Sequence, residues 1–315
     1  MKRLTILAIL TGMCYNAFCW GFFGHKKINY TAVFLLPQEM LLFYKTNIAY
    51  IEEHAVDPDK RRYAIKEEGP RHFIDIDLYG EYPYNNLPRK WNDAVNKFSE
   101  DTLLSRGIVP WHVMNMYNRL KKAFKEKDAP KILKYSAEIA HYISDAHVPL
   151  HTSHNHNGQH TNQHGIHGFW ESRIPELLAE KQFDFFIGKA QYISDPSDYI
   201  WERVLESAAA SDSVLRFERE LNLNFKNDRK YAFEERNNVI AHQYSEKYTV
   251  AYNKLLNGMV ERRMRLSIFS TASFWYSAWV DAGQPDLSQL IYNAENNINE
   301  EEPINISGKM IGREE

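Results

Sequence analysis

The sequence predicts an all-α protein built as a single multi-helix domain, and two observations support this prediction. First, apolar residues recur at helical spacing along most of the chain. In residues 37–55, for example, Leu41, Ile48 and Ile51 lie near a 3.6-residue period, and Pro37 suits a first helical turn. Second, no run of strand length alternates convincingly between polar and apolar residues. A bundle of helices is therefore the simplest architecture.

Further helices are expected where the same periodicity returns. Glycine and proline cluster between the periodic segments, notably in residues 77–88 and 155–165, and we interpret these two stretches as loops. The expected helices span approximately residues 90–105, 110–127, 129–146, 167–180, 197–218 and 230–279, with the last of them broken into two or more pieces.

The first nineteen residues have the features of a secretory signal peptide. Two basic residues precede the apolar run Leu4–Met13, and small residues stand at the positions expected before a cleavage site after Cys19. The apolar run is too short to span a bilayer. We therefore expect an exported protein, secreted or periplasmic, whose mature chain begins at Trp20 and has no transmembrane segment.

The mature chain is expected to consist of one helical domain, residues 20–292, and a polar and acidic tail, residues 293–315, that is expected to be disordered. Cys14 and Cys19 would leave with the signal peptide, so the domain would depend on its own core and on bound metal for stability. The net charge of -3 gives no electrostatic argument for strong nucleic-acid binding, although it does not exclude a nucleic-acid substrate. No obligate protein partner is evident.

Histidines and carboxylates gather in the stretch "HYISDAHVPLH", residues 141–151. His141 and Asp145 are four residues apart, so they share one face of a helix. Pro149 makes continuation of that helix unfavourable, and the resulting bend lets His151 return toward the same space. Three potential metal ligands therefore converge from one short segment.

A second pair with the same spacing follows in "HGFWE", where His167 and Glu171 are four residues apart. Imidazole nitrogen and carboxylate oxygen are the ligands that zinc takes outside thiolate sites. Two separate pairs indicate more than one metal ion. Other candidate ligands are Asp57 or Asp59 in "AVDPDKRR" and His72 in "PRHFIDID".

The expected start of the mature chain supplies another candidate. His25 stands five residues after Trp20 in "WGFFGH", and a free amino terminus at Trp20 could chelate a metal through its amine and carbonyl. The remaining histidines are weaker candidates, because a histidine-rich loop is more often solvated than catalytic and a histidine in a helical pattern is more often structural. These are His54, His112, His147, His154, His156, His160, His164 and His242.

The order and spacing of these motifs, from Trp20 to Glu171, resemble the zinc-dependent phospholipase C family and its relatives, the S-one/P-one single-strand nucleases. The resemblance implies the multi-helix fold of that superfamily and three zinc ions per chain. Carried over onto this sequence, it implies a first zinc held by Asp57 (alternatively Asp59), His72, His141 and Asp145, a second held by His151, His167 and Glu171, and a third held by the Trp20 amine and carbonyl and by His25, with Asp145 bridging to the first.

The activity that the resemblance implies is hydrolysis of phosphoester bonds, with Asp57 placed to hold or deprotonate the attacking nucleophile. Glu171 matches the phospholipases, which favours a phospholipase C-like phosphodiesterase. The spacing from Trp20 to His25 matches the nucleases, which leaves a single-strand nuclease or 3'-nucleotidase as the alternative. The substrate would accordingly be a phospholipid or a single-stranded nucleic acid. A hypothesis of another class is a zinc-binding protein without catalysis, whose histidine-rich loop gathers metal.

Overall fold

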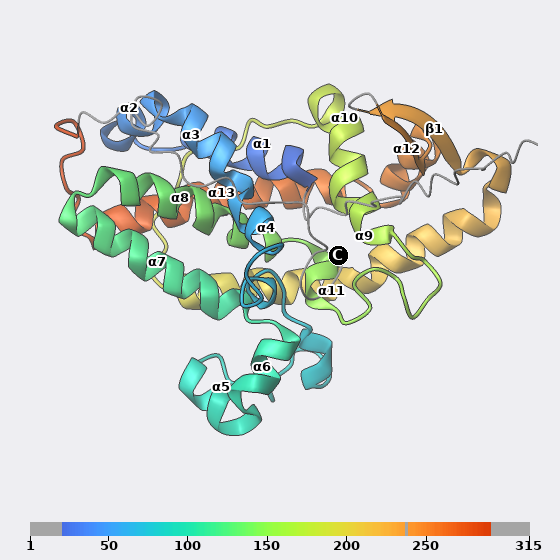
Figure 1. Cartoon of the computed structure of the whole chain (residues 1–315), viewed down its shortest axis with the longest axis horizontal. Helices are drawn as coiled ribbons and strands as arrows, with labels where there is room; N and C mark the ends of the chain where they lie inside the picture. Colours follow the sequence, from blue (N-terminus) through green and yellow to red (C-terminus); the bar gives the residue numbers. More distant parts are fainter. Residues whose placement is uncertain (1–20, 237–238, 291–315) are drawn as a thin grey trace, which may run out of the picture.

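The computed structural model describes residues 21–236 and 239–290, and helices dominate it (Figure 1). The prediction of an all-α fold is confirmed, with one small addition, a two-stranded hairpin. The α-helices are α1 (Gly21–Val33), α2 (Gln38–Thr46), α3 (Ile48–Glu53), α4 (Asp57–Arg61), α5 (Trp91–Phe98), α6 (Glu100–Arg106), α7 (Val109–Glu126), α8 (Ala129–Asp145), α9 (Ile166–Gly168), α10 (Ile174–Gln182), α11 (Pro196–Asn224), α12 (Glu246–Leu255) and α13 (Met259–Asp281). The short elements are the 3-10 helices η1 (His54–Val56), η2 (Gly69–Arg71), η3 (Ile76–Tyr79), η4 (Pro149–Thr152) and η6 (Asn227–Arg229), the π-helix η5 (Phe169–Arg173), and the strands β1 (Tyr231–Arg236) and β2 (Val239–Tyr244).

Helix α8 lies at the centre of the core, between α7, α13, α1 and α3. Its last ten residues, from Ser136 to Asp145, are all buried. Trp275 of α13 donates its indole N–H to the Ser136 carbonyl at 3.0 Å and stacks on Tyr44 of α2, so aromatic packing fixes α8 against both neighbours. His141 is therefore held in the protein interior and not on a solvent-exposed face of the helix.

The expected helices 110–127 and 129–146 correspond to α7 and α8, and the sequence explains their boundary. Lys127 takes a left-handed conformation after α7, and Asp128 caps α8 by accepting a hydrogen bond from the Lys131 backbone N–H at 3.1 Å. The expected helix 90–105 is in fact two helices, α5 and α6. Ser99 separates them with a φ of 68°, and its hydroxyl accepts from the Thr102 backbone N–H at the start of α6. Figure 1 shows these two helices projecting from the body.

The prediction of helix from residue 230 onward is wrong for its first part. Strands β1 and β2 form an antiparallel hairpin in which Phe233 pairs with His242 and Glu235 with Ile240. The remainder of the segment is helical, as α12 and α13, and Gly258, with a φ of 73°, separates those two helices. In Figure 1 the hairpin and α2 lie at opposite ends of the long axis.

The expected signal peptide, residues 1–19, and the expected tail, residues 293–315, both fall outside the described residues, and so does Trp20. The domain boundaries therefore stay predictions. Within residues 21–236 and 239–290, no helix is both long enough and apolar enough to cross a bilayer.

The loop that carries His72 is fixed by a close backbone approach at Gly107. The Ile108 backbone N–H donates to the Pro70 carbonyl at 2.7 Å, which brings the end of α6 against this loop. Gly107 has a φ of 85° and a ψ of 152°, a conformation that is strained for residues with a side chain. A β-carbon at this position would lie 2.2 Å from the Phe73 carbonyl oxygen. Only glycine therefore permits this approach.

We predict that Gly107→Ala lowers the free energy of unfolding by about 3 kcal/mol or more, because the backbone strain and the overlap with Phe73 add. Gly165→Ala is the matched control, since Gly165 also has a φ of 85° but a β-carbon there would meet nothing within 4 Å. The control should cost about 1 kcal/mol. Urea unfolding of both variants measures the difference, and equal losses would contradict the role given to the contact with Phe73.

Candidate metal centre

Buried histidines and carboxylates gather into three groups whose ligand atoms lie within 4.8 Å of one another. All of their members are less than 5% exposed. Two of the groups share a histidine, and each group has the composition of a zinc site without thiolates. The groups are His25, His141 and Asp145; Asp59, His72 and His141; and His151, His167 and Glu171.

Four donor atoms, one each from Asp59, His72, His141 and Asp145, lie close to one another. His72 Nδ1 lies 3.0 Å from Asp145 Oδ2 and 3.1 Å from His141 Nε2. His141 Nε2 lies 3.4 Å from Asp145 Oδ2 and 3.5 Å from Asp59 Oδ1, and Asp59 Oδ1 lies 3.8 Å from His72 Nδ1. Zinc bonds of 2.0–2.2 Å in a tetrahedron separate neighbouring donors by about 3.3–3.6 Å. Two of the five distances lie in this range and the other three lie within about 0.3 Å of it, so the donor set has the size of a zinc site.

The second oxygen of Asp145 faces a different ligand. Asp145 Oδ1 lies 3.5 Å from His25 Nε2, whereas its Oδ2 belongs to the set around His141. The His25 ring stacks on the His141 ring, with centroids 3.8 Å apart. A carboxylate that presents one oxygen to each of two donor sets has the geometry of a bridge between two metal positions. Helix α1, which carries His25, begins at Gly21, the residue that follows Trp20 in the sequence.

The third group takes its carboxylate from a π-helix, η5, and its two histidines from η4 and α9. His167 Nε2 lies 3.0 Å from Glu171 Oε2, and His151 Nε2 lies 3.4 Å from the same oxygen. Glu171 is part of η5. π-helical turns are rare in proteins, and those that occur are often found at functional sites. His151 also connects this group to the first, because its Nδ1 donates to the His72 carbonyl at 2.6 Å. The donor sets thus form one contiguous centre.

Hydrogen bonds hold the imidazole rings in the tautomers that metal binding needs. A carbonyl only accepts, so His141 Nδ1, 2.8 Å from the Ala55 carbonyl, and His151 Nδ1, at the His72 carbonyl, both carry their proton. The lone pair of each ring is then at Nε2, which is the atom that faces the donor sets. Orientation of a ligating histidine by a second hydrogen bond is general in metal sites.

His25 is held in the same way by a hydroxyl. The single proton of Ser144 Oγ is donated to the His141 carbonyl at 2.7 Å. His25 Nδ1, 2.9 Å from that hydroxyl, must therefore be the donor to it, and the lone pair of His25 lies at Nε2. Among the described residues, neither His25 Nε2 nor either carboxylate oxygen of Asp59 has a hydrogen-bond partner. Buried polar atoms without partners are costly, and a bound cation would satisfy them.

Two of these histidines are neutral near pH 7 because they are buried. Burial lowers the pKa of His72 to about 4, and burial, followed by the neighbouring His141, holds the pKa of His25 well below its usual range. Neutral imidazole is the form that binds metal, so no proton has to be removed from either ring before a metal enters.

The structure places Asp59, and not the expected Asp57, among the grouped donor atoms. Asp57 accepts from Lys60 at 3.0 Å and lies 2.5 Å from His54 Nδ1, away from the donor sets. Asp59, two residues later, points inward to His72 and His141. The other sequence-predicted ligands within the described residues do meet: His25, His72, His141, Asp145, His151, His167 and Glu171.

A buried carboxylate that the sequence did not single out supports this centre. Glu68 accepts hydrogen bonds from the guanidinium groups of Arg61 and Arg71, at 3.3 and 2.7 Å, and from the Tyr142 hydroxyl. Its Oε1 faces His72 Nε2 at 3.6 Å, on the side of the ring opposite to the donor set. Burial alone would raise the pKa of Glu68, but His72, Arg61 and Tyr142 together hold it well below its usual range. Arg61 and Arg71 are therefore structural partners of Glu68.

The remaining histidines lie outside the three groups within the described part of the chain. His147 is buried and bonded to the Ile143 carbonyl and to Ser270, and His154 is bonded to Asp77. His242, expected on a helix, stands on β2.

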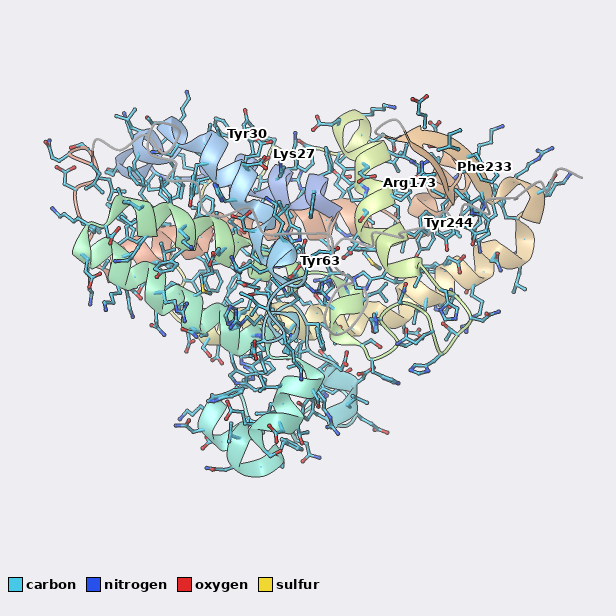
Figure 2. The ribbon with its side chains drawn as sticks, in the orientation of Figure 1. Lys27, Tyr30, Tyr63, Arg173, Phe233 and Tyr244 are labelled. Carbon is cyan, nitrogen blue, oxygen red and sulfur yellow. The ribbon has the colours of Figure 1, made fainter. Side chains whose placement is uncertain are left out.

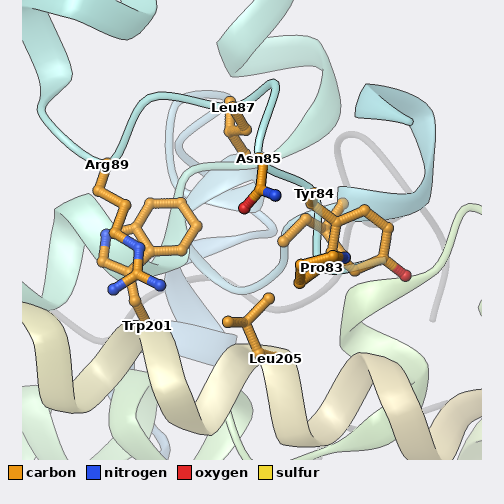
Figure 3. A pocket seen from close by; sticks show the side chains of 8 residues that line it. Pro83, Tyr84, Asn85, Leu87, Arg89, Trp201 and Leu205 are labelled. Atoms are coloured by element: carbon orange, nitrogen blue, oxygen red, sulfur yellow. The ribbon is translucent and has the colours of Figure 1, made fainter. Parts of the chain in front are cut away.

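A cavity of about 220 Å³ lies between the loop that follows η3 and helix α11 (Figure 3), and no member of the three groups lines it. It is lined by Ile76, Pro83, Tyr84, Asn85, Leu87, Arg89, Trp201 and Leu205.

No protein-family model matches the chain, and no curated protein matches it in sequence. One similar solved structure is the alpha toxin from Clostridium absonum, which is 12% identical, with 84% of this chain and 65% of the toxin chain covered and a TM-score of 0.47. The chain thus spans just under two thirds of that protein's length. We therefore infer function from the geometry of the buried donor atoms.

We predict that Glu68→Gln lowers the free energy of unfolding at pH 7 by about 2–4 kcal/mol, because it removes the charge that compensates Arg61 and Arg71. Glu67→Gln, at the neighbouring exposed position, is the control and should change stability by less than about 0.5 kcal/mol. Denaturant unfolding of both variants measures the effect. Equal stability of the two variants would contradict the structural role of Glu68.

The pH dependence of this difference follows from the lowered pKa. The unfolded chain protonates Glu68 near pH 4.5 while the folded chain does not, so the stabilisation is complete above pH 4.5 and is lost as the pH falls below it. The difference in the free energy of unfolding between the wild type and Glu68→Gln should therefore decrease as the pH falls below 4.5.

Proposed function

We propose that the chain is a zinc-dependent hydrolase of phosphodiesters, with phospholipase C-like activity as its first candidate function. The observation that carries the proposal is the set of five distances, 3.0–3.8 Å, among the donor atoms of Asp59, His72, His141 and Asp145. Three of these distances join residues that are far apart in the sequence, namely His72 with His141 and Asp145, and Asp59 with His141. Such a set of imidazoles and carboxylates is typical of a zinc site rather than of ion pairs with lysine or arginine.

In this proposal three zinc positions share one centre. Asp59, His72, His141 and Asp145 would hold the first ion, and His151, His167 and Glu171 the second. His25 and the other oxygen of Asp145 would contribute to the third, together with the amine and carbonyl of Trp20 once residues 1–19 have been removed during export. The third position is supported by His25 Nε2, which lies 3.5 Å from Asp145 Oδ1.

Zinc, when bound, would supply a Lewis acid for a phosphoryl oxygen and would lower the pKa of a coordinated water to about 7. The protein's own contribution is a buried set of donors, in which hydrogen bonds fix the tautomers of His25, His141 and His151. Asp59 Oδ1 faces His72 and His141, so its Oδ2 is the candidate to accept a proton from the attacking water. The role expected for Asp57 thus passes to Asp59.

A single-strand nuclease or 3'-nucleotidase is the second candidate. It is favoured by the spacing from Trp20 to His25 and by the cavity in Figure 3, whose wall includes the rings of Tyr84 and Trp201. Aromatic side chains in a cavity of this size could stack on a single base.

We predict that Asp59→Asn removes about one zinc ion per chain, because an amide is a poorer zinc ligand than a carboxylate. Asp57→Asn is the matched control: the same chemical change, two residues away, outside the donor sets. Zinc per chain, measured by mass spectrometry of metals after dialysis, should fall only in the first variant. A loss in Asp57→Asn with none in Asp59→Asn would restore Asp57 as the ligand.

The experiment that tests the function uses the mature protein, beginning at Trp20, on mixed phospholipid micelles and on single-stranded DNA in parallel. Each reaction is run with a chelator and again after zinc is added back. Chelator-sensitive release of a phosphorylated head group is the expected result. Cleavage of DNA alone would establish the second candidate. Zinc uptake without hydrolysis of either substrate, or of a small chromogenic phosphodiester, would indicate a binding protein without catalysis.

A further inference from the structure

The hairpin β1–β2 packs directly against the π-helix that carries Glu171. The Phe169 ring, at the start of η5, stacks on the Tyr244 ring of β2 with centroids 3.8 Å apart and an interplanar angle of 15°. Phe169 also stacks on Tyr252 of α12, with centroids 5.0 Å apart. The apolar side of η5 is therefore covered by the hairpin and by the helix that follows it.

Arg173, the last residue of η5, fastens the same element to both strands. Its Nε donates to the Tyr244 carbonyl at 3.0 Å, and its Nη2 donates to Glu234 Oε2 at 2.6 Å. Glu234 is fixed in turn by Gln243, whose amide donates to the same oxygen at 3.0 Å. Only 9% of the Arg173 surface is exposed, so water competes weakly for these bonds. Figure 2 shows Arg173 and Tyr244 in the region between α10 and the hairpin.

Glu171 lies midway between these two attachment points, two residues after Phe169 and two before Arg173. A π-helical turn contains an extra residue, so small changes in its winding swing the side chains that it carries. Metal ligands tolerate displacements of about 0.5 Å. The winding of η5 therefore decides whether Glu171 meets His167 and His151.

We propose that the hairpin is the positioning element of the His151–His167–Glu171 group, and that Arg173 and Glu234 are its positioning residues. The inference rests on the proposed function, because it takes this group to be a zinc site. It also gives residues beyond Glu171 a role in the centre, whereas every proposed ligand lies at or before Glu171. Loosening the hairpin should weaken zinc binding at this group and leave the donor set on α4 and α8 in place.

The test compares Arg173→Lys and Glu234→Gln with a matched control, Arg263→Lys. The Arg263 side chain is exposed to the same 10% as that of Arg173, and it joins α13 to α11 through Glu206 and Ser207 without contact to η5. Zinc transfer from the loaded full-length mature protein to a chromophoric chelator is followed over time. Zinc per chain and the free energy of unfolding are measured on the same samples.

In both hairpin variants, one zinc ion per chain should be released about 10-fold or more faster than in the wild type, because zinc is held more weakly when the support behind its ligands is lost. The control should lose stability but keep the wild-type release profile. If Arg173→Lys does not fold, Glu234→Gln still decides, because that carboxylate is 34% exposed. If the wild type binds zinc and all three variants release it at the wild-type rate, the positioning role is overturned and the proposed function is not. A wild type without zinc would overturn the proposed function instead.

Discussion

The arrangement of this protein depends on the carboxylate of Asp145, which is buried at the end of α8 and presents its two oxygens to two different sets of histidines. A buried carboxylate is unfavourable unless positive charge compensates it. The imidazoles of His25 and His72 do not supply that charge at neutral pH, because burial lowers the pKa of both. The fold thus brings carboxylates and imidazoles together in its interior, which are ligand types that divalent zinc binds.

The rest of the architecture keeps these donors in place. Helix α8 is buried on all sides over its last turns, so its position is set by packing against α7 and α13 rather than by local propensity. The loop with His72 is held by backbone hydrogen bonds to the end of α6 and, through the Ile74 backbone N–H, to the His151 carbonyl at 2.9 Å. Glu68 fills the space behind the His72 ring with two arginines and a tyrosine. Donor side chains that are already held in place lose less conformational entropy when a metal ion binds.

Features of the centre that depend on local periodicity are predictable from the sequence. The pairs His141 with Asp145 and His167 with Glu171 are recognisable because four residues make about one helical turn, and both pairs do meet. The choice between Asp57 and Asp59 cannot be made in this way, because α4 is a five-residue helix whose orientation is set by its neighbours. His54 pairs with Asp57, whereas Asp59 faces inward.

Other features depend on contacts between distant residues. The residue pattern does not predict the hairpin, because its strands alternate only partly between polar and apolar residues. The two asparagines between the strands are the one local turn signal. The π-helix has no signal in the residue pattern, and the bond from Arg173 to Glu234 spans 61 positions. Glu68 resembles any other glutamate of a charged segment until the fold surrounds it. Tertiary packing, rather than propensity, determines each of these features.

The most direct test of the metal centre is X-ray diffraction from crystals of the mature protein at wavelengths on either side of the zinc absorption edge. We expect anomalous density that appears only above the edge, with one peak among Asp59, His72, His141 and Asp145 and another among His151, His167 and Glu171. Clear electron density for these side chains with no anomalous peak between them, in crystals grown with zinc, would contradict the assignment of a zinc centre.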